Sequence, residues 1–190
     1  MKIGIDIDEV LGHFLPALTE FHNCTYGTNL KVEQFHSYNF WEICGGTKEE
    51  MLKKIDDFEL TPYFKNIQAV AGAKDSVKAL KEKHELFIIT SRPISLMQET
   101  KIWLDKNFPN TFSNIFFANN EPRGQKTKSK GEYCNELGLE IMIEDSAIFD
   151  NECTSPDRKV FLINQPWNKN SEVSPDIIRV NSWDEIMKQI

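Results

Sequence analysis

Six short runs of apolar residues recur along the chain, and polar or turn-forming residues bound each of them. Most runs are nearly continuous rather than alternating, which is typical of strands that are buried on both faces of a sheet. They predict strands over residues 2–7, 86–90, 115–118, 140–143, 160–163 and 177–180. Helices are therefore expected on both faces of the sheet.

Helical patterns occupy the segments between the later runs. Residues 73–83 have apolar positions at helical spacing, and three further segments begin with a serine followed three residues later by Glu or Gln. That spacing is a capping box, and it predicts helix starts at Ser95, Ser129 and Ser182. Gly138 is expected to end the second of these helices. Alternating strands and helices predict a Rossmann-like α/β fold, a parallel sheet in a three-layer core.

Residues 14–70 break this alternation. They hold apolar residues at helical spacing, an aromatic stretch (FHSYNFWEICGG) and a capping box at Thr47 and Glu50, but no strand pattern. A small all-helical insertion after the first strand is the natural interpretation. The predicted division is a core of residues 1–13 and 71–190 and a helical unit of residues 14–70. The polar stretch 119–130 is predicted as a long loop.

Composition narrows the class of protein. A net charge of −7 argues against a general nucleic-acid-binding protein or a basic membrane-binding surface. The amino-terminal residues lack a signal-peptide pattern, and no apolar window has the length of about 20 residues that a membrane span needs. The four cysteines are widely spaced, so free thiols are favoured over a zinc site. A cytoplasmic protein is expected, either a monomer or a homodimer.

Two carboxylates stand where the first strand should end. Asp6 and Asp8 are separated by one residue, so alternation would place both side chains on one side of the strand. Ligands of open α/β sheets bind beyond the carboxyl ends of the strands, and Mg²⁺ prefers oxygen ligands. The alternative is a strand that ends in a polar turn, with Asp8 or Glu9 capping the next helix.

Polar residues also follow two other predicted strands. Thr90 and Ser91 end the second strand, where hydroxyl and backbone N–H groups suit a phosphate, although they would equally suit a helix cap before Pro93. Glu144 and Asp145 follow the strand at 140–143.

Basic residues and one further carboxylate lie nearby in the chain. Lys126, Lys128 and Lys130 could each neutralise phosphate charge or lie on the solvated surface. Asp150 is either part of the acidic group or a surface carboxylate, and Arg92 either reaches phosphate or sugar or lies on the surface.

The order of these groups resembles the haloacid dehalogenase (HAD) superfamily of phosphohydrolases. DIDEV resembles its first motif, Thr90 in ITSRP its second, Lys130 in KSKGEYC its third, and MIEDSAIFD its fourth. The resemblance covers the whole chain and is strongest to the 5′(3′)-deoxyribonucleotidase-like branch, whose members have a short helical cap after the first motif. In this comparison Lys130 is preferred to Lys128, because it immediately precedes the predicted helix.

The resemblance implies roles for the matching residues. Asp6 would be the nucleophile of an aspartyl-phosphate mechanism, and Asp8 would act as general acid and base. Mg²⁺ would be held by Asp6, the Asp8 carbonyl and Asp145, while Thr90, Ser91 and Lys130 would bind phosphate. Glu144 replaces the aspartate that many relatives have, so it would act in an outer shell or through water.

Substrate choice is expected to depend on the helical unit. Phe14, Phe40 and Trp41 could stack on a base, although aromatic residues with such spacing more often belong to a core. The leading hypothesis is a phosphatase of nucleoside monophosphates. The alternatives are a phosphatase of another small metabolite such as a phosphosugar, and a non-catalytic phosphate-binding module. A response-regulator-like domain fits the helical insertion and the Asp-x-Asp spacing poorly.

Overall fold

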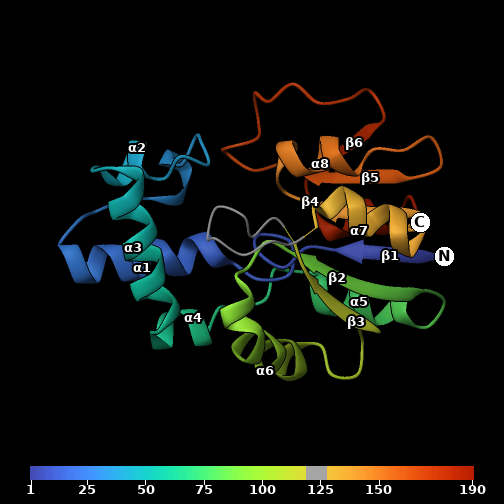
Figure 1. Ribbon diagram of the computed structural model, residues 1–190, viewed down its shortest axis with the longest axis horizontal. Coiled ribbons are helices and arrows are strands. Elements are labelled where there is room, and N and C mark those ends of the chain that lie inside the picture. Colours follow the sequence, from blue (N-terminus) through green and yellow to red (C-terminus); the bar gives the residue numbers. More distant parts are fainter. Residues whose placement is uncertain (119–127) are drawn as a thin grey trace.

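One six-stranded parallel sheet organises the molecule (Figure 1). The computed structural model describes residues 1–118 and 128–190. The strand order is β3-β2-β1-β4-β5-β6. The strands are β1 (Lys2–Ile5), β2 (Glu85–Thr90), β3 (Asn114–Phe117), β4 (Ile141–Glu144), β5 (Lys159–Ile163) and β6 (Ile177–Val180). All six predicted strands are present, and the Rossmann-like α/β prediction is confirmed.

Helices cover both faces of this sheet. Successive residues of the central strands alternate between two apolar clusters: Ile88 of β2 belongs to one and Ile89 to the other. Helices α5 (Ala73–Lys81), α6 (Met97–Asn107) and α9 (Trp183–Met187) contribute to the first cluster. Helices α7 (Lys130–Leu137) and α8 (Ala147–Cys153) contribute to the second. The continuous apolar runs therefore reflect strands with two buried faces.

Two of the three serine capping boxes start helices as predicted. The Ser129 hydroxyl accepts a hydrogen bond from the Glu132 amide at the start of α7, and Ser182 does the same at α9. Gly138 ends α7 in the left-handed region with φ 63°. The prediction at Ser95 is wrong. This serine lies inside the 3-10 turn η2 (Ile94–Leu96), which begins directly after Pro93. Helix α6 then starts at Met97 without a side-chain cap.

Residues 14–70, hereafter the insertion, lie beside the sheet in Figure 1 and contain helices but no strand. The Thr47–Glu50 capping box starts one of them as predicted. The helices are α1 (Phe14–Tyr26), η1 (Val32–Gln34), α2 (Trp41–Cys44), α3 (Lys48–Glu59) and α4 (Pro62–Lys65). Most of the predicted loop 119–130 lies outside the described residues. Lys130, at its end, already belongs to α7.

Two expectations from composition can be compared with the structure. All four cysteines are free thiols, as favoured. Within residues 1–118 and 128–190, no helix has the length and apolar character needed to cross a membrane.

Candidate active site

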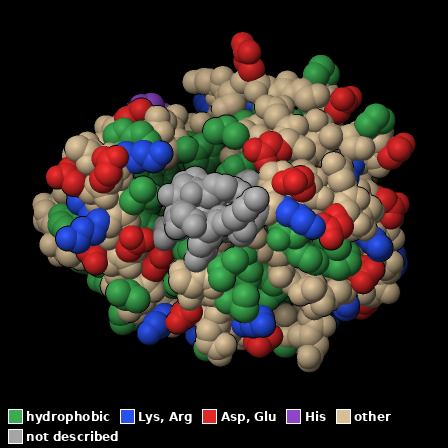
Figure 2. All heavy atoms as spheres, viewed as in Figure 1, with side chains coloured by type: hydrophobic (Ala, Val, Ile, Leu, Met, Phe, Trp, Pro, Cys, Tyr) green, Lys and Arg blue, Asp and Glu red, His purple; other side chains and the backbone are tan. Residues whose placement is uncertain are grey.

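A pocket of about 220 Å³ lies beyond the carboxyl ends of the central strands. Its walls come from the turns after β1 and β2, the end of β4, helices α7 and α8, the segment after β5 and the insertion. In the view of Figure 2, hydrophobic side chains gather between the insertion at the left and the sheet at the right. The polar lining includes Asp6, Asp8, Ser91, Lys130 and Asp145. The topology thus joins chain segments that lie more than a hundred residues apart.

The first strand is shorter than predicted, and this changes how its two carboxylates are placed. β1 ends at Ile5, and the Ile7 carbonyl accepts hydrogen bonds from three amides of the following turn. Asp6 and Asp8 therefore lie beyond the strand in a tight turn, yet both line the pocket. Glu9 adopts φ 61°, and its carboxylate accepts a hydrogen bond from the Leu15 amide in α1. Glu9 thus caps the next helix, as the alternative interpretation foresaw.

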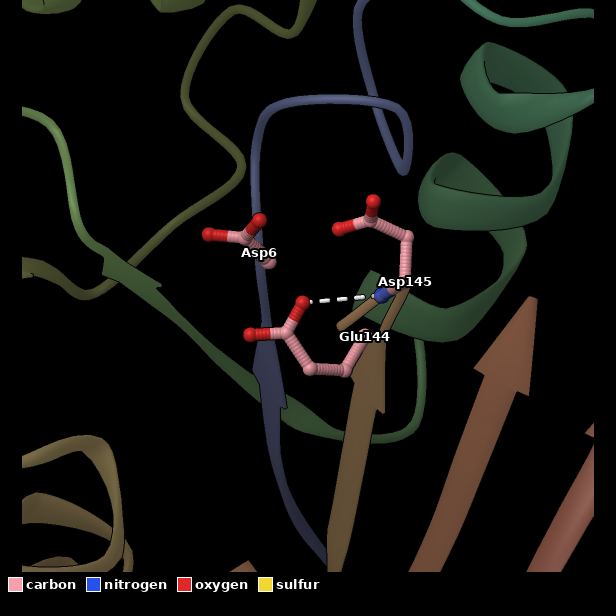
Figure 3. A group of neighbouring side chains, drawn as sticks. All are labelled: Asp6, Glu144 and Asp145. Atoms are coloured by element: carbon pink, nitrogen blue, oxygen red, sulfur yellow. Dashed lines mark hydrogen bonds between the residues drawn. The ribbon is translucent and has the colours of Figure 1, made fainter. Parts of the chain in front are cut away.

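Three carboxylates and one lysine form the centre of the pocket. Asp6, Glu144 and Asp145 each present an oxygen within 4.8 Å of the others (Figure 3). Lys130 lies 3.0 Å from Asp6 Oδ1 and pairs with Glu144 Oε1. Glu144 Oε2 accepts hydrogen bonds from the amides of Asp145 and Ser146. Both oxygens of Glu144 therefore have protein partners, which leaves Asp6 and Asp145 as the better candidates to hold a cation.

The electrostatics of this group fit a divalent cation. Burial, with Glu144 nearby, raises the pKa of Asp6 to about 7, although Lys130 opposes the shift. Burial and the charges of Glu144 and Asp6 raise the pKa of Asp145 well above its usual value. Burial alone would lower the pKa of Lys130, but the two acidic partners outweigh it and raise that pKa. The single positive charge of Lys130 does not balance the negative charges of the three carboxylates. Carboxylate oxygens are hard donors, which Mg²⁺ prefers.

Arg92 holds the carboxylate of Asp8. Its Nη2 lies 2.6 Å from Asp8 Oδ1, and its Nε lies 3.1 Å from Oδ2. The guanidinium is buried, with its Cζ 4.8 Å from the Phe64 ring and 5.9 Å from the Trp103 ring. Arg92 is therefore not a surface residue, and two nitrogens of its guanidinium contact the Asp8 carboxylate in the pocket. This contact between two motif residues was not anticipated from the sequence.

The predicted phosphate-binding hydroxyls are placed differently from each other. Thr90 is fully buried, and its hydroxyl accepts a hydrogen bond from the Arg92 amide. Ser91 lines the pocket, and its buried hydroxyl oxygen has no hydrogen-bond partner among the described residues. A buried hydroxyl without a hydrogen-bond partner destabilises the fold. A ligand oxygen that accepts a hydrogen bond from Ser91 would remove this cost, and its binding would be favoured.

The remaining charged candidates separate by burial. Lys128 pairs with Glu136 and is exposed, whereas Lys130 is buried at the pocket centre. Asp150 is fully buried in α8, which rules out the surface-carboxylate interpretation. Neither of its oxygens has a hydrogen-bond partner within the described chain, and burial raises its pKa well above the usual value. Lys126 lies outside the described residues.

Aromatic residues of the insertion reach the pocket only in part. Phe14 and Phe40 line it, whereas Trp41 does not and instead lies under the Lys48 ammonium at 6.0 Å. Sequence reasoning missed three further aromatic side chains of the pocket wall, Tyr38, Phe149 and Trp167. Tyr38 lies in the aromatic stretch of the insertion and Phe149 in the segment MIEDSAIFD, but no spacing rule connects these side chains with the strand ends.

The fold is that of the HAD superfamily. A haloacid dehalogenase-like hydrolase of Streptococcus pneumoniae matches with a TM-score of 0.71 and 12% identity, over 99% of this chain and 97% of that one. The "putative HAD-hydrolase YfnB" of Bacillus subtilis, solved bound to magnesium, matches with a TM-score of 0.63 and 15% identity, again over 99% of this chain and 97% of that one. At these identities the likeness concerns the fold alone.

Family membership is more specific. Residues 1–190 match the model of the family described as "5' nucleotidase, deoxy (Pyrimidine), cytosolic type C protein", so the chain belongs to that family. A curated relative, "Putative nucleotidase OB0422" of Oceanobacillus iheyensis, is 25% identical over 99% of this chain and 98% of its own length. The chain is therefore a phosphatase of the HAD superfamily, and the non-catalytic module is set aside.

Proposed function

We propose that the protein is a Mg²⁺-dependent phosphomonoesterase of nucleoside monophosphates, with 5′(3′)-deoxyribonucleotides as the preferred substrates. The observation that carries this proposal is the position of Asp6, buried at the pocket between Lys130 and the carboxylate of Asp145. The substrate class is supported by the family description and by the name of the nucleotidase relative.

The chemistry follows from two carboxylates in two steps. A carboxylate oxygen of Asp6 attacks phosphorus, the ester P–O bond breaks, and Asp8 donates a proton to the leaving alkoxide. Asp8 then accepts a proton from water, whose oxygen attacks the phosphorus of the aspartyl phosphate. The bond to Asp6 breaks and inorganic phosphate leaves. Lys130, Thr90 and Ser91 would stabilise the charge on the phosphate oxygens.

Asp6, Asp145 and the backbone carbonyl of Asp8 would hold the Mg²⁺ ion. The bound ion supplies charge compensation between the nucleophile and an anionic substrate. Glu144 would orient Lys130 rather than bind the ion, because both of its oxygens have protein partners. Magnesium in the solved YfnB structure supports the choice of metal.

The insertion would act as a cap, with the core formed by residues 1–13 and 71–190. Phe14 and Phe40 lie on the pocket wall and offer rings on which a base could stack, at about 1–3 kcal/mol per base. Trp41 would take no direct part, because it is not in the pocket wall. A cytoplasmic location is also proposed, supported by the word cytosolic in the family description.

A second candidate substrate is a smaller phosphoester such as a phosphosugar. Pocket size favours it, because 220 Å³ is below the roughly 300–1,000 Å³ of most ligand pockets. The chemistry at Asp6 and Asp8 would be unchanged. Only the use of the aromatic wall would differ.

Phosphate release from a panel of nucleoside monophosphates and phosphosugars would test the proposal. Activity should require Mg²⁺, stop with chelator, and be greatest with deoxynucleoside monophosphates. Asp6→Asn, prepared identically, should be inactive and so exclude a contaminating phosphatase. Release from phosphosugars alone would favour the second candidate. Full activity in excess chelator would refute the metal requirement.

A further inference from the structure

The side chain and backbone of Asp145 are held from two directions by neutral donors. The Tyr38 hydroxyl lies 2.9 Å from Asp145 Oδ2 and 2.7 Å from its carbonyl oxygen. Trp167 Nε1 donates to the same Oδ2 at 2.9 Å and lies 2.8 Å from the Tyr38 hydroxyl oxygen. Asn168 Nδ2 donates to the Asp145 carbonyl at 2.7 Å. Three polar groups from two separate segments therefore meet at one residue.

These donors come from different parts of the molecule. Tyr38 lies in the insertion between η1 and α2, whereas Trp167 and Asn168 follow β5 in the sheet part of the chain. Their positions are fixed by packing, since Trp167 and Asn168 are buried and the Tyr38 and Trp167 rings make an edge contact at 6.0 Å.

The arrangement leaves one oxygen of Asp145 for another partner. Oδ2 takes both donors, while Oδ1 receives no hydrogen bond from any residue in the described ranges. Figure 3 shows one carboxylate oxygen of Asp145, the residue that follows β4, directed toward Asp6. Partners behind a metal-binding carboxylate fix its orientation, and their removal typically costs about 10–100-fold in metal affinity.

We propose that Tyr38 and Trp167 are positioning residues that hold Asp145 for the cation, and that cation binding thereby depends on the insertion being docked at Tyr38. The inference rests on the proposed function only in taking Asp145 as a metal ligand. It adds that the insertion contributes to the metal site itself. Linkage then requires that the bound cation stabilise the docked insertion in return.

Calorimetric titration of the full-length protein with Mn²⁺ would measure the effect. Tyr38→Phe removes one hydroxyl and keeps the ring, and Trp167→Phe removes the indole donor. Each should weaken Mn²⁺ binding about 10-fold. The double variant should lose less than the product of the two effects, because both donors act on one oxygen. Tyr63→Phe is the matched control, since this tyrosine of the insertion is not in the pocket wall and should bind Mn²⁺ as the wild type does.

Hydrogen exchange supplies a readout independent of activity and of affinity. Saturating Mg²⁺ should slow amide exchange around residues 32–44 in the wild type and in Tyr63→Phe, but much less in Tyr38→Phe. Wild-type affinity in Tyr38→Phe, or equal protection with and without its hydroxyl, would overturn the inference and leave the proposed function intact. Absence of any Mn²⁺ binding by the wild type would overturn both.

Discussion

The charge of Asp6 opposes folding when no cation is bound, and Asp6→Asn should reveal the size of this opposition. Burial raises the pKa of Asp6 from 3.8 to about 7. Between these two values the folded protein retains a proton that the unfolded chain has released, so stability falls as pH rises. Asparagine cannot ionise, so the stability of the variant should fall less than that of the wild type as pH rises.

The magnitude follows from the size of the pKa shift. Each pKa unit corresponds to about 1.4 kcal/mol, so the shift from 3.8 to about 7 is worth about 4 kcal/mol over the full titration. Between pH 5 and pH 8 the corresponding part is about 3 kcal/mol. Lys130 does not contribute to the change in stability between pH 5 and pH 8. Its pKa is raised in the folded protein, so its stabilising contribution is fully present below the usual lysine pKa of 10.5 and is lost only at higher pH.

Urea unfolding at pH 5 and pH 8 in excess chelator would measure the effect. The difference in free energy of unfolding between Asp6→Asn and wild type should rise by about 3 kcal/mol in favour of the variant from pH 5 to pH 8. In a separate assay with Mg²⁺, the variant should have no phosphatase activity. Asp105→Asn, an exposed carboxylate of α6, should follow the wild type at both pH values. The reasoning is refuted if Asp6→Asn and wild type lose the same stability between the two pH values.

Three further predictions concern the neighbours of this residue. Asp8→Asn should lower steady-state turnover by about 10²–10⁴-fold yet retain a stoichiometric p-nitrophenol burst in stopped-flow assays, because this leaving group needs little protonation; unchanged turnover would contradict its role. Arg92→Met should lower kcat in wild type but have little further effect in the Asp8→Asn background, as measured by a double-mutant cycle, because Arg92 contacts the Asp8 carboxylate; additive losses would assign Arg92 to the substrate instead. Gly131→Ala should cost about 1–3 kcal/mol in urea unfolding, because its Cβ would clash with the Glu152 carbonyl oxygen; unaltered stability would show that α7 and α8 can separate.

The sheet was predictable because its determinants are local. Strands buried on both faces need continuous apolar runs, and residues such as Ile88 and Ile89 show why, since they enter opposite clusters. The two wrong predictions in this part of the chain also have local causes. β1 stops at Ile5 because the Ile7 carbonyl closes a tight turn, and Ser95 falls within a 3-10 turn after Pro93. Apolar character at Ile7 serves the core without extending the strand.

The candidate site was predictable only where chain order reflects the sheet. Parallel strands bring their carboxyl ends to one edge, so Asp6, Ser91 and Asp145 could be expected near one another. The partners of these residues depend on side-chain packing between distant segments. Arg92 could not be assigned to Asp8, nor Tyr38 to Asp145, because those contacts span 84 and 107 residues without a motif that links them.

The insertion contacts both halves of the pocket, and this has a physical consequence for the enzyme. Phe64 of α4 packs against the Arg92 guanidinium that holds Asp8, and the Ile67 carbonyl accepts a hydrogen bond from Trp103, the second ring beside Arg92. On the other side, Tyr38 holds Asp145. A displacement of the insertion would therefore disturb the surroundings of Asp8 and of Asp145 together. Substitutions that displace the insertion, even outside the pocket wall, should then affect turnover as well as substrate choice.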